Sequence, residues 1–273
     1  MVKMKIGFIG CGALCTSIIT GLLNRNYISS SQIYITTSNP ENTEIKAKEL
    51  SVNACKTNTE LAEKCDLVIL GTKPFAITHV VSEIAQTLKS RQPVVVSVAA
   101  GTSINKIYSA ACGYPLIRVM PNIGAKVASS TTGIFPSENT TPTQLETVKE
   151  LFEQVGSVVV LKSETQFSPF VGIAGSSPAF TFMFIEAMAK AATKYGIDKK
   201  TAIQIATNAV KGAATLAEHD VQNGSSMGSL IDELCTAGGT TIEGILAAEE
   251  YGLSNAIIKA VSATTEKDQI LNK

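Results

Sequence analysis

The first residues suited to chemistry form a glycine-rich turn near the start of the chain. An apolar run over residues 6–9 predicts a buried strand, and periodic apolar residues from position 18 onward predict a helix. Between them stand Gly10, Cys11, Gly12, Ala13 and Leu14. In such a turn the first glycine permits a sharp bend, the second lets the backbone approach a pyrophosphate, and the helix N-terminus offers free N–H groups to the anion. The pattern indicates a dinucleotide site, although an ordinary strand-to-helix turn remains the alternative.

A short polar segment bears on the choice of cofactor. Thr37, Ser38 and Asn39 follow a predicted strand over residues 33–36, and no acidic residue stands among them. A site selective for NAD commonly has Asp or Glu here, which binds the ribose 2′-hydroxyl and repels a 2′-phosphate. The three polar side chains can instead donate hydrogen bonds to a phosphate, so the sequence favours NADPH and leaves NADH possible. The alternative is a plain polar turn before Pro40.

A second stretch with chemical potential lies near the end of the chain. Thr240, followed three residues later by Glu243, fits a capping box, so we expect Thr240 to be the N-cap of a helix with its hydroxyl occupied. The hydroxyl of Thr241 is then free. Gly238 and Gly239 let the backbone approach a ligand, and the bare N–H groups of the helix start suit a carboxylate. Taken alone, the stretch also fits an ordinary helix start.

The elements that must position these residues alternate between strand and helix. Further strands are predicted over residues 66–70, 93–98, 116–120 and 157–161, and helices to about residue 50 and from 143 to 154. This alternation predicts an α/β domain with a parallel sheet, which binds ligands at the carboxyl ends of its strands. Lys73 and the turn Ala99-Ala100-Gly101 fall at such ends. A single lysine is by default a solvated side chain.

The remainder of the chain is predicted to be helical. No charged residue occurs from position 165 to 185, but prolines and the cluster Gly175-Ser176-Ser177-Pro178 interrupt this stretch. We therefore expect a helix, a tight turn and a second helix rather than a membrane span. Residues 179–192 are apolar on two faces, which predicts cover by a second subunit, with burial inside one chain as the alternative.

Composition excludes several classes of protein. The chain has 273 residues, a formal net charge of zero and no basic run, so no nucleic-acid partner is expected. The six cysteines show no C-x-x-C spacing and the two histidines stand far apart, so neither a metal site nor a disulfide framework is expected. Reduced thiols and the absence of room for a signal peptide before the glycine-rich turn predict a cytoplasmic protein.

Taken together, the motifs have a recognisable order. They are Gly10-x-Gly12, Lys73-Pro74, Ala99-Ala100-Gly101, Arg118-Val119-Met120-Pro121-Asn122, Gly175-Ser176-Ser177-Pro178-Ala179 and Gly238-Gly239-Thr240-Thr241. In this combination the chain resembles pyrroline-5-carboxylate reductase over essentially its whole length. The resemblance implies a Rossmann domain over residues 1–162, followed by an all-helical dimerisation domain over residues 163–273, and a homodimer that forms larger rings in many members.

The resemblance also implies which residues bind ligands. Cofactor contacts are expected from Gly10, Cys11, Gly12, Ala13, Leu14, Thr37, Ser38, Asn39, Asn58, Thr72, Lys73 and Ala100, to which we add Pro74 and Asn122. Substrate contacts are expected from Glu164, Thr236, Thr240 and Thr241, with Gly238 and Gly239 beside them.

The implied reaction is hydride transfer from the nicotinamide to the imine carbon of 1-pyrroline-5-carboxylate, which gives L-proline. The cofactor carries the chemistry and the protein orients it. We expect the hydroxyl of Thr241 to be catalytic at the ring nitrogen and the backbone of residues 239–241 to bind the carboxylate.

Four residues depart from the pattern of the family. Cys15 replaces a usual Ala or Gly, Ile123-Gly124 a common Thr-Pro, Ala237 a proline, and Glu233 an asparagine that can touch the cofactor. Two alternatives therefore remain open. One is a related reductase of another imine or ketoacid derivative, and the other is a non-catalytic NADP-binding regulator that kept the fold.

Overall fold

The computed structural model describes residues 4–272, which form two compact units. The first unit comprises residues 4–176 together with 262–272, and the second comprises Ser177–Val261. The boundary predicted from the sequence, between residues 162 and 163, follows the last strand. The boundary between the two compact units falls later, between residues 176 and 177, and residues 262–272 belong to the first unit again.

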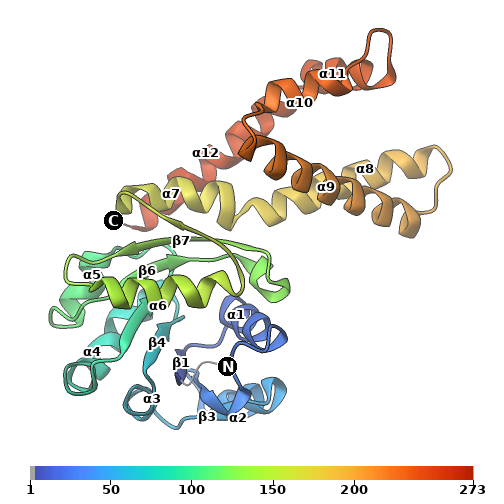
Figure 1. The fold of residues 1–273 in the computed structure, drawn as a ribbon. Coiled ribbons are helices and arrows are strands. Elements are labelled where there is room, and N and C mark those ends of the chain that lie inside the picture. The colour runs from blue at the N-terminus through green and yellow to red at the C-terminus, as the bar shows by residue number, and fades with distance from the viewer. Residues whose placement is uncertain (1–3, 273) are drawn as a thin grey trace. The chain divides into compact units, whose positions relative to one another are not determined.

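The first unit is built on one eight-stranded sheet with the order β3-β2-β1-β4-β5-β6-β7-β8 (Figure 1). Its strands are β1 (Ile6–Ile9), β2 (Ile33–Thr36), β3 (Asn53–Ala54), β4 (Leu67–Leu70), β5 (Val94–Ser97), β6 (Ile117–Met120), β7 (Ser130–Pro136) and β8 (Gly156–Val160). The strands β1 to β6 are parallel, as predicted. The last two strands differ from the parallel arrangement that was predicted, because β7 pairs antiparallel with β6 and β8 runs parallel to β7.

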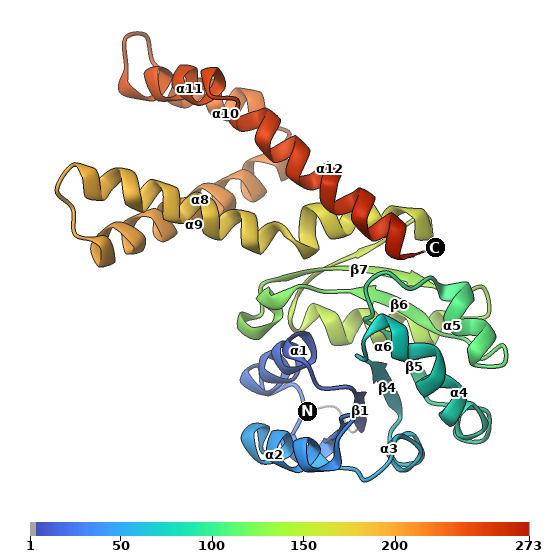
Figure 2. The ribbon, with the colours of Figure 1, turned by 180° about the vertical axis from the view of Figure 1, so that it is seen from behind.

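Helices cover both faces of this sheet (Figure 2). They are α1 (Ala13–Asn24), α2 (Pro40–Leu50), α3 (Asn58–Lys64), α4 (Pro74–Arg91), α5 (Ile104–Ala110) and α6 (Pro142–Glu153). One buried cluster joins apolar residues of α1 and α6 to one face of the strands, and a second joins α3, α4 and α5 to the other. Successive strand side chains point to opposite faces, so Phe8 belongs to the first cluster and Ile9 to the second.

A long helical segment connects the sheet to the second unit. It contains the 3-10 turn η3 (Glu164–Gln166), α7 (Phe167–Phe170), the π-helical turn η4 (Val171–Gly175) and α8 (Ser177–Lys194). The tight turn predicted around Gly175 is wrong. The N–H of Ser176 donates to the carbonyl of Val171 over 2.9 Å, and Pro178 sits in the first turn of α8, where a missing N–H is tolerated.

The same segment has the composition of a membrane span. By length and composition, the helical stretch Glu164–Lys194 could cross a bilayer, and 17% of its apolar window is buried in this chain. Apolar side chains left exposed on a helix are equally typical of a surface that packs against another subunit.

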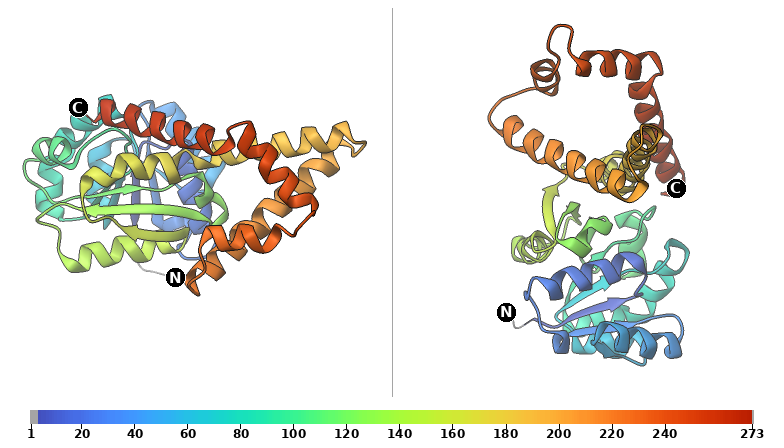
Figure 3. Two further views of the ribbon diagram at one scale, coloured as in Figure 1. Left: turned by 90° about the horizontal axis from the view of Figure 1, so that it is seen from above. Right: turned by 90° about the vertical axis from the view of Figure 1, so that its right-hand side faces the viewer.

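The second unit is all-helical, as predicted. It contains α8, α9 (Lys199–Gln222), α10 (Met227–Leu234), α11 (Thr240–Glu250) and the first part of α12 (Leu253–Leu271). Helices α8 and α9 follow one another through a short loop and pack against each other (Figure 3). Of the α8 side chains, only Ala189 is buried, while Phe182 and Met183 are 60% and 70% exposed. Most of the apolar surface of α8 is therefore uncovered within one chain.

Candidate cofactor and substrate sites

The turn between β1 and α1 has the backbone that an anion requires. Gly10 has a φ of +88°, and a Cβ at this position would lie 2.8 Å from the carbonyl carbon of Gly71, so a larger residue is excluded. Gly12 is the N-cap of α1, has no side-chain cap, and has open space where a Cβ would stand. No acidic residue occurs in the first turn of α1. Its N–H groups are therefore available to a phosphate.

Cys15 on α1 fits its position because the residue that faces it, Gly71, has no side chain. Its thiol is buried and lies where a Cβ of Gly71 would be. In this motif a third glycine usually lets the helix approach the strand closely. Here Gly71, which follows β4, provides that space. Burial raises the pKa of the Cys15 thiol well above its ordinary value and also raises that of Cys11. Both thiols are protonated at neutral pH.

The polar turn after β2 leaves one hydroxyl unused. The Thr37 hydroxyl donates to the carbonyl of Asn39 over 2.7 Å, and the Asn39 side chain caps α2 by accepting the N–H of Glu41 over 2.8 Å. Ser38 is exposed, and within residues 4–272 no intramolecular partner of its hydroxyl is recorded. Of the three predicted residues, Ser38 is therefore the most available donor for a ribose phosphate.

Asn58 lies after β3, at the start of α3, and Thr72 lies after β4. The amide of Asn58 is held from both ends, since its Oδ1 accepts the hydroxyl of Thr36 over 2.8 Å and its Nδ2 donates to Glu83 over 2.9 Å. The Thr72 hydroxyl is buried without a hydrogen-bond partner in the described part of the chain, and the Thr72 backbone N would stand 2.9 Å from a Cβ on Gly10. A buried polar atom without a partner, beside the glycine-rich turn, fits a ligand that supplies one.

Lys73 and Pro74 start α4 at the same edge of the sheet. Lys73 is the exposed N-cap of α4 without a side-chain cap bond, and Pro74 is the first residue of the helix. Ala100 is exposed in the loop between β5 and α5. The backbone positions of these residues follow the carboxyl ends of β4 and β5, which is where the alternation of strands and helices predicted a ligand.

Asn122 is engaged within the protein. Its Oδ1 accepts the N–H of Gly124 over 2.8 Å, and its Nδ2 donates to the carbonyl of Ala174 over 2.9 Å. A Cβ on Gly124 would lie 2.5 Å from the carbonyl oxygen of Ser129. These contacts explain one departure from the family: a proline at position 124 has no N–H for Asn122 and no space for its ring.

Glu164 is also tied to the protein. One of its carboxylate oxygens accepts the N–H of Ile104 over 2.6 Å and a guanidinium N–H of Arg118 over 2.8 Å. The Arg118 side chain is 2% exposed, lies over the Phe167 ring at 4.4 Å, and was not singled out from the sequence as a site residue. A buried guanidinium needs a carboxylate partner, so Glu164 has a structural task whether or not it touches substrate.

The predicted substrate loop lies in the second unit and is exposed. The N–H of Gly239 donates to the carbonyl of Thr236 over 2.9 Å, and Gly238 has a φ of +68°. The capping-box prediction is wrong by one residue, because Gly239 is the N-cap of α11, without a side-chain cap, and Thr240 is its first residue. The hydroxyls of Thr240 and Thr241 are therefore both free of a capping role, and the first N–H groups of α11 are bare.

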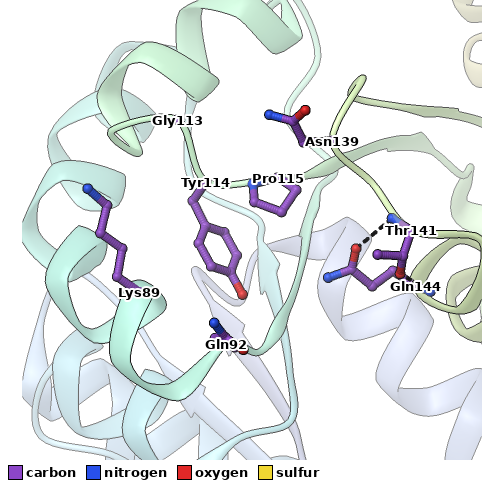
Figure 4. A pocket seen from close by; sticks show the side chains of 8 residues that line it. All are labelled: Lys89, Gln92, Gly113, Tyr114, Pro115, Asn139, Thr141 and Gln144. Carbon is purple, nitrogen blue, oxygen red and sulfur yellow. Dashed lines mark hydrogen bonds between the residues drawn. The ribbon is translucent and has the colours of Figure 1, made fainter.

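A concave surface lies near the amino ends of β5 and β6, at the other end of the strands from the glycine-rich turn. A cavity of about 370 Å³ is lined by Lys89, Gln92, Gly113, Tyr114, Pro115, Asn139, Thr141 and Gln144 (Figure 4). The Tyr114 hydroxyl donates to the carbonyl of Pro93 over 2.6 Å, and Thr141 and Gln144 cap the start of α6. None of the predicted site residues lines this cavity. Among residues 4–272, no group of three metal-ligating side chains occurs.

Comparison with known proteins decides the family. The pyrroline-5-carboxylate reductase dimerisation model matches residues 164–271, and the model of NADP oxidoreductase, coenzyme F420-dependent, matches residues 5–101. The pyrroline-5-carboxylate reductase of Escherichia coli K12 is 36% identical over 99% of both chains. The chain belongs to the pyrroline-5-carboxylate reductase family.

Solved structures agree with this assignment. The 1-pyrroline-5-carboxylate reductase of Streptococcus pyogenes is 32% identical, with a TM-score of 0.87 over 97% of this chain and 98% of that one. The pyrroline carboxylate reductase of Plasmodium falciparum, solved with NADP bound, has a TM-score of 0.89 over the whole of both chains at 23% identity, which supports the fold.

Proposed function

We propose that this protein reduces 1-pyrroline-5-carboxylate to L-proline with NADPH, at a site built from the residues that match its family. The observation that carries this proposal is the glycine-rich turn of a family member, in which α1 starts uncapped at Gly12 and the neighbour of Gly10, Thr72, has a buried hydroxyl without a partner in the described chain. NADPH, when bound, would supply the hydride to the imine carbon, and the ring nitrogen would take its proton from solvent.

The residues of the first unit fit that cofactor. The backbone N–H groups at the start of α1 bind the pyrophosphate, and the Ser38 hydroxyl with the Lys73 ammonium supplies donors to phosphate oxygens. The Thr72 hydroxyl gains the partner that it lacks within the protein. Ala100 has only a methyl side chain and is exposed, so its backbone can lie against a flat ring.

The residues of the second unit fit the substrate. The bare N–H groups of Thr240 and Thr241 bind and orient the carboxylate, because a helix N-terminus carries a partial positive charge. The Thr241 hydroxyl donates a hydrogen bond to the ring nitrogen. This bond strengthens as the imine becomes an amine, whose nitrogen is the better acceptor, so it favours the transition state over the ground state.

Assembly and location complete the proposal. The dimerisation model spans α8, whose exposed Phe182 and Met183 we assign to contact with a second subunit rather than with lipid. The net charge of zero and the scarcity of arginine fit a protein without a nucleic-acid partner. We place the protein in the cytoplasm, as a homodimer that can assemble into a larger ring.

The first experiment measures NADPH oxidation with 1-pyrroline-5-carboxylate and with its six-membered analogue. We expect turnover with the five-membered ring and a lower kcat/KM with the six-membered one. A preference for the six-membered ring would make the protein a related imine reductase. NADPH binding without turnover of either ring would make it a regulator and overturn the proposal.

The second experiment compares Thr241→Ala with Thr240→Ala. Loss of the Thr241 hydroxyl is expected to lower kcat by about tenfold or more and to change KM less, because the bond tightens in the transition state. Because Gly239 caps α11, Thr240→Ala is expected to change stability by less than about 0.5 kcal/mol and to leave kcat within about twofold. The reverse result would assign the nitrogen contact to Thr240.

A further inference from the structure

The loop between β5 and α5, residues 99–103, is held from outside by residues far away in the sequence. The N–H of Ile104, just after this loop, donates to Glu164 over 2.6 Å. Within the loop, Gly101 has a φ of +63°, and a Cβ at this position would lie only 2.7 Å from the Cβ of Leu271 on α12. The end of α12 therefore packs directly on the loop that contains Ala100.

A second connection runs from α12 to the same loop through buried polar groups. Arg118 donates through Nη1 to Glu164 over 2.8 Å and through Nη2 to Asn272 Oδ1 over 3.0 Å. The same oxygen of Glu164 accepts the N–H of Ile104 and a hydrogen bond from Arg118. The side chains of Asn272, Arg118 and Glu164 therefore form a continuous path to the end of the loop. All of them belong to the first unit.

The far end of this path is fixed by a buried carboxylate. Asp268 is 5% exposed, and its Oδ2 accepts the Nδ2 of Asn272 over 2.7 Å and the hydroxyl of Ser168 over 2.8 Å. The amide of Asn272 is thus oriented with its oxygen on Arg118 and its nitrogen on Asp268. An amide fixed at both ends has a single orientation, so its acceptor faces the guanidinium.

We propose that the last turn of α12 together with Asn272, which follows it, is a positioning element that sets the conformation of the loop 99–103 for cofactor binding. Asn272 acts through Arg118 and Glu164, and Leu271 acts by packing on Gly101. The inference rests on the proposed function in one respect, the assignment of Ala100 to the cofactor. Neither Asn272 nor Leu271 is among the residues expected to touch a ligand.

The test uses the full-length protein and titrates NADPH without substrate. Asn272→Ala is expected to raise the Kd of NADPH by about fivefold or more and to speed hydrogen exchange at the amides of residues 100–104. Gln269→Ala is the matched control, because Gln269 is an exposed amide on the same turn for which no hydrogen bond is recorded in the described chain. It is expected to leave Kd and exchange unchanged.

A purely structural role would change different quantities. If Asn272→Ala lowers the thermal midpoint but binds NADPH like the Gln269→Ala control, the inference is overturned. Leu271 is 51% exposed, so Leu271→Ala provides a second variant that decides the question if Asn272→Ala does not fold. It is expected to weaken NADPH binding, and unchanged binding would again overturn the inference. Failure of the wild-type protein to bind NADPH would instead refute the proposed function.

Discussion

The backbone N–H of Gly239 donates to the carbonyl oxygen of Thr236 over 2.9 Å, which closes a four-residue turn immediately before α11. Its third residue, Gly238, has a φ of +68°, a value typical of the third position of a type II turn. The second position is Ala237, where proline is favoured in such turns and where the resemblance noted from the sequence implies one. The loop thus has the backbone of a type II turn without a proline to restrict it.

Replacing Ala237 by proline is expected to stabilise the protein. A proline at the second position restricts the unfolded chain without straining the turn, which contributes about 0.4–1 kcal/mol to the free energy of unfolding. A more rigid loop is also expected to lower the KM for the substrate. Urea unfolding and steady-state kinetics measure the two effects. Ala237→Gly, the control, should shift both in the opposite direction, and a destabilised proline variant would show that the turn is not of type II.

Cofactor preference is expected to depend on Ser38. The wild-type enzyme should have a higher kcat/KM with NADPH than with NADH, because no acid stands in this turn to repel the 2′-phosphate. Ser38→Asp introduces that repulsion and should lower kcat/KM for NADPH by about tenfold or more, with little effect on NADH. Ser38→Ala separates loss of the hydroxyl from added charge and should have the smaller effect. A wild-type preference for NADH would contradict the assignment.

Association of subunits is expected to require the exposed face of α8. The Phe182 side chain is 60% exposed in one chain, and Phe182→Glu would bury a carboxylate in an apolar interface. We expect sedimentation at micromolar concentration to show a dimer or larger assembly for the wild type and a monomer for the variant. Phe75→Glu, at an 87% exposed aromatic of the first unit, controls for the change in charge. A fully active wild-type monomer would refute the expectation.

Stability is expected to fall in alkaline solution. Burial raises the pKa of the Cys55 thiol to about 11 and that of Cys65 to about 12. In the unfolded chain these thiols ionise near pH ~8.5, so above that pH the unfolded state holds fewer protons and is favoured, until pH passes the folded-state values. Each thiol contributes up to about 1.4 kcal/mol per pH unit to this loss.

Urea unfolding at several pH values between 8 and 10.5 measures this slope. Cys65→Ala should make it shallower, whatever its effect on stability at neutral pH. Cys112→Ser is the matched control, because Cys112 is an exposed cysteine and its replacement should leave the slope close to that of the wild type. A free energy of unfolding that is constant over this range would contradict the assigned pKa values.

The strands with apolar runs could be predicted from the sequence, whereas β7 could not. Its Ser130 and Thr132 are at most 2% exposed, and their hydroxyls lie 3.2 Å apart, within hydrogen-bond distance. A buried strand that contains paired hydroxyls has no apolar run to reveal it. The direction of β7 depends on its pairing with β6, and that of β8 on its pairing with β7, and no local pattern encodes either.

The glycine-rich strand-to-helix turn was predictable because its sequence pattern is local, but the contacts of Glu164 were not. Its partners Ile104 and Arg118 stand 60 and 46 positions away in the sequence, and only the fold brings them together. The start of α11 shows the opposite limit. The sequence Thr240 to Glu243 fits a capping box, yet the turn that ends at Gly239 fixes the helix start one residue earlier. A local capping motif does not determine where a helix starts when a neighbouring turn fixes the backbone conformation.

The return of α12 to the first unit also governs the order in which the chain can fold. The second unit, Ser177–Val261, is inserted between the sheet and the segment that completes it. A ribosome therefore makes all of the second unit before Leu271 exists to cover Gly101. Until then the first unit lacks the end of α12, and Arg118 has no Asn272 to bind. The first unit therefore reaches its native packing only after the second unit has been synthesised, and we expect its folding to be completed by the segment that follows Val261.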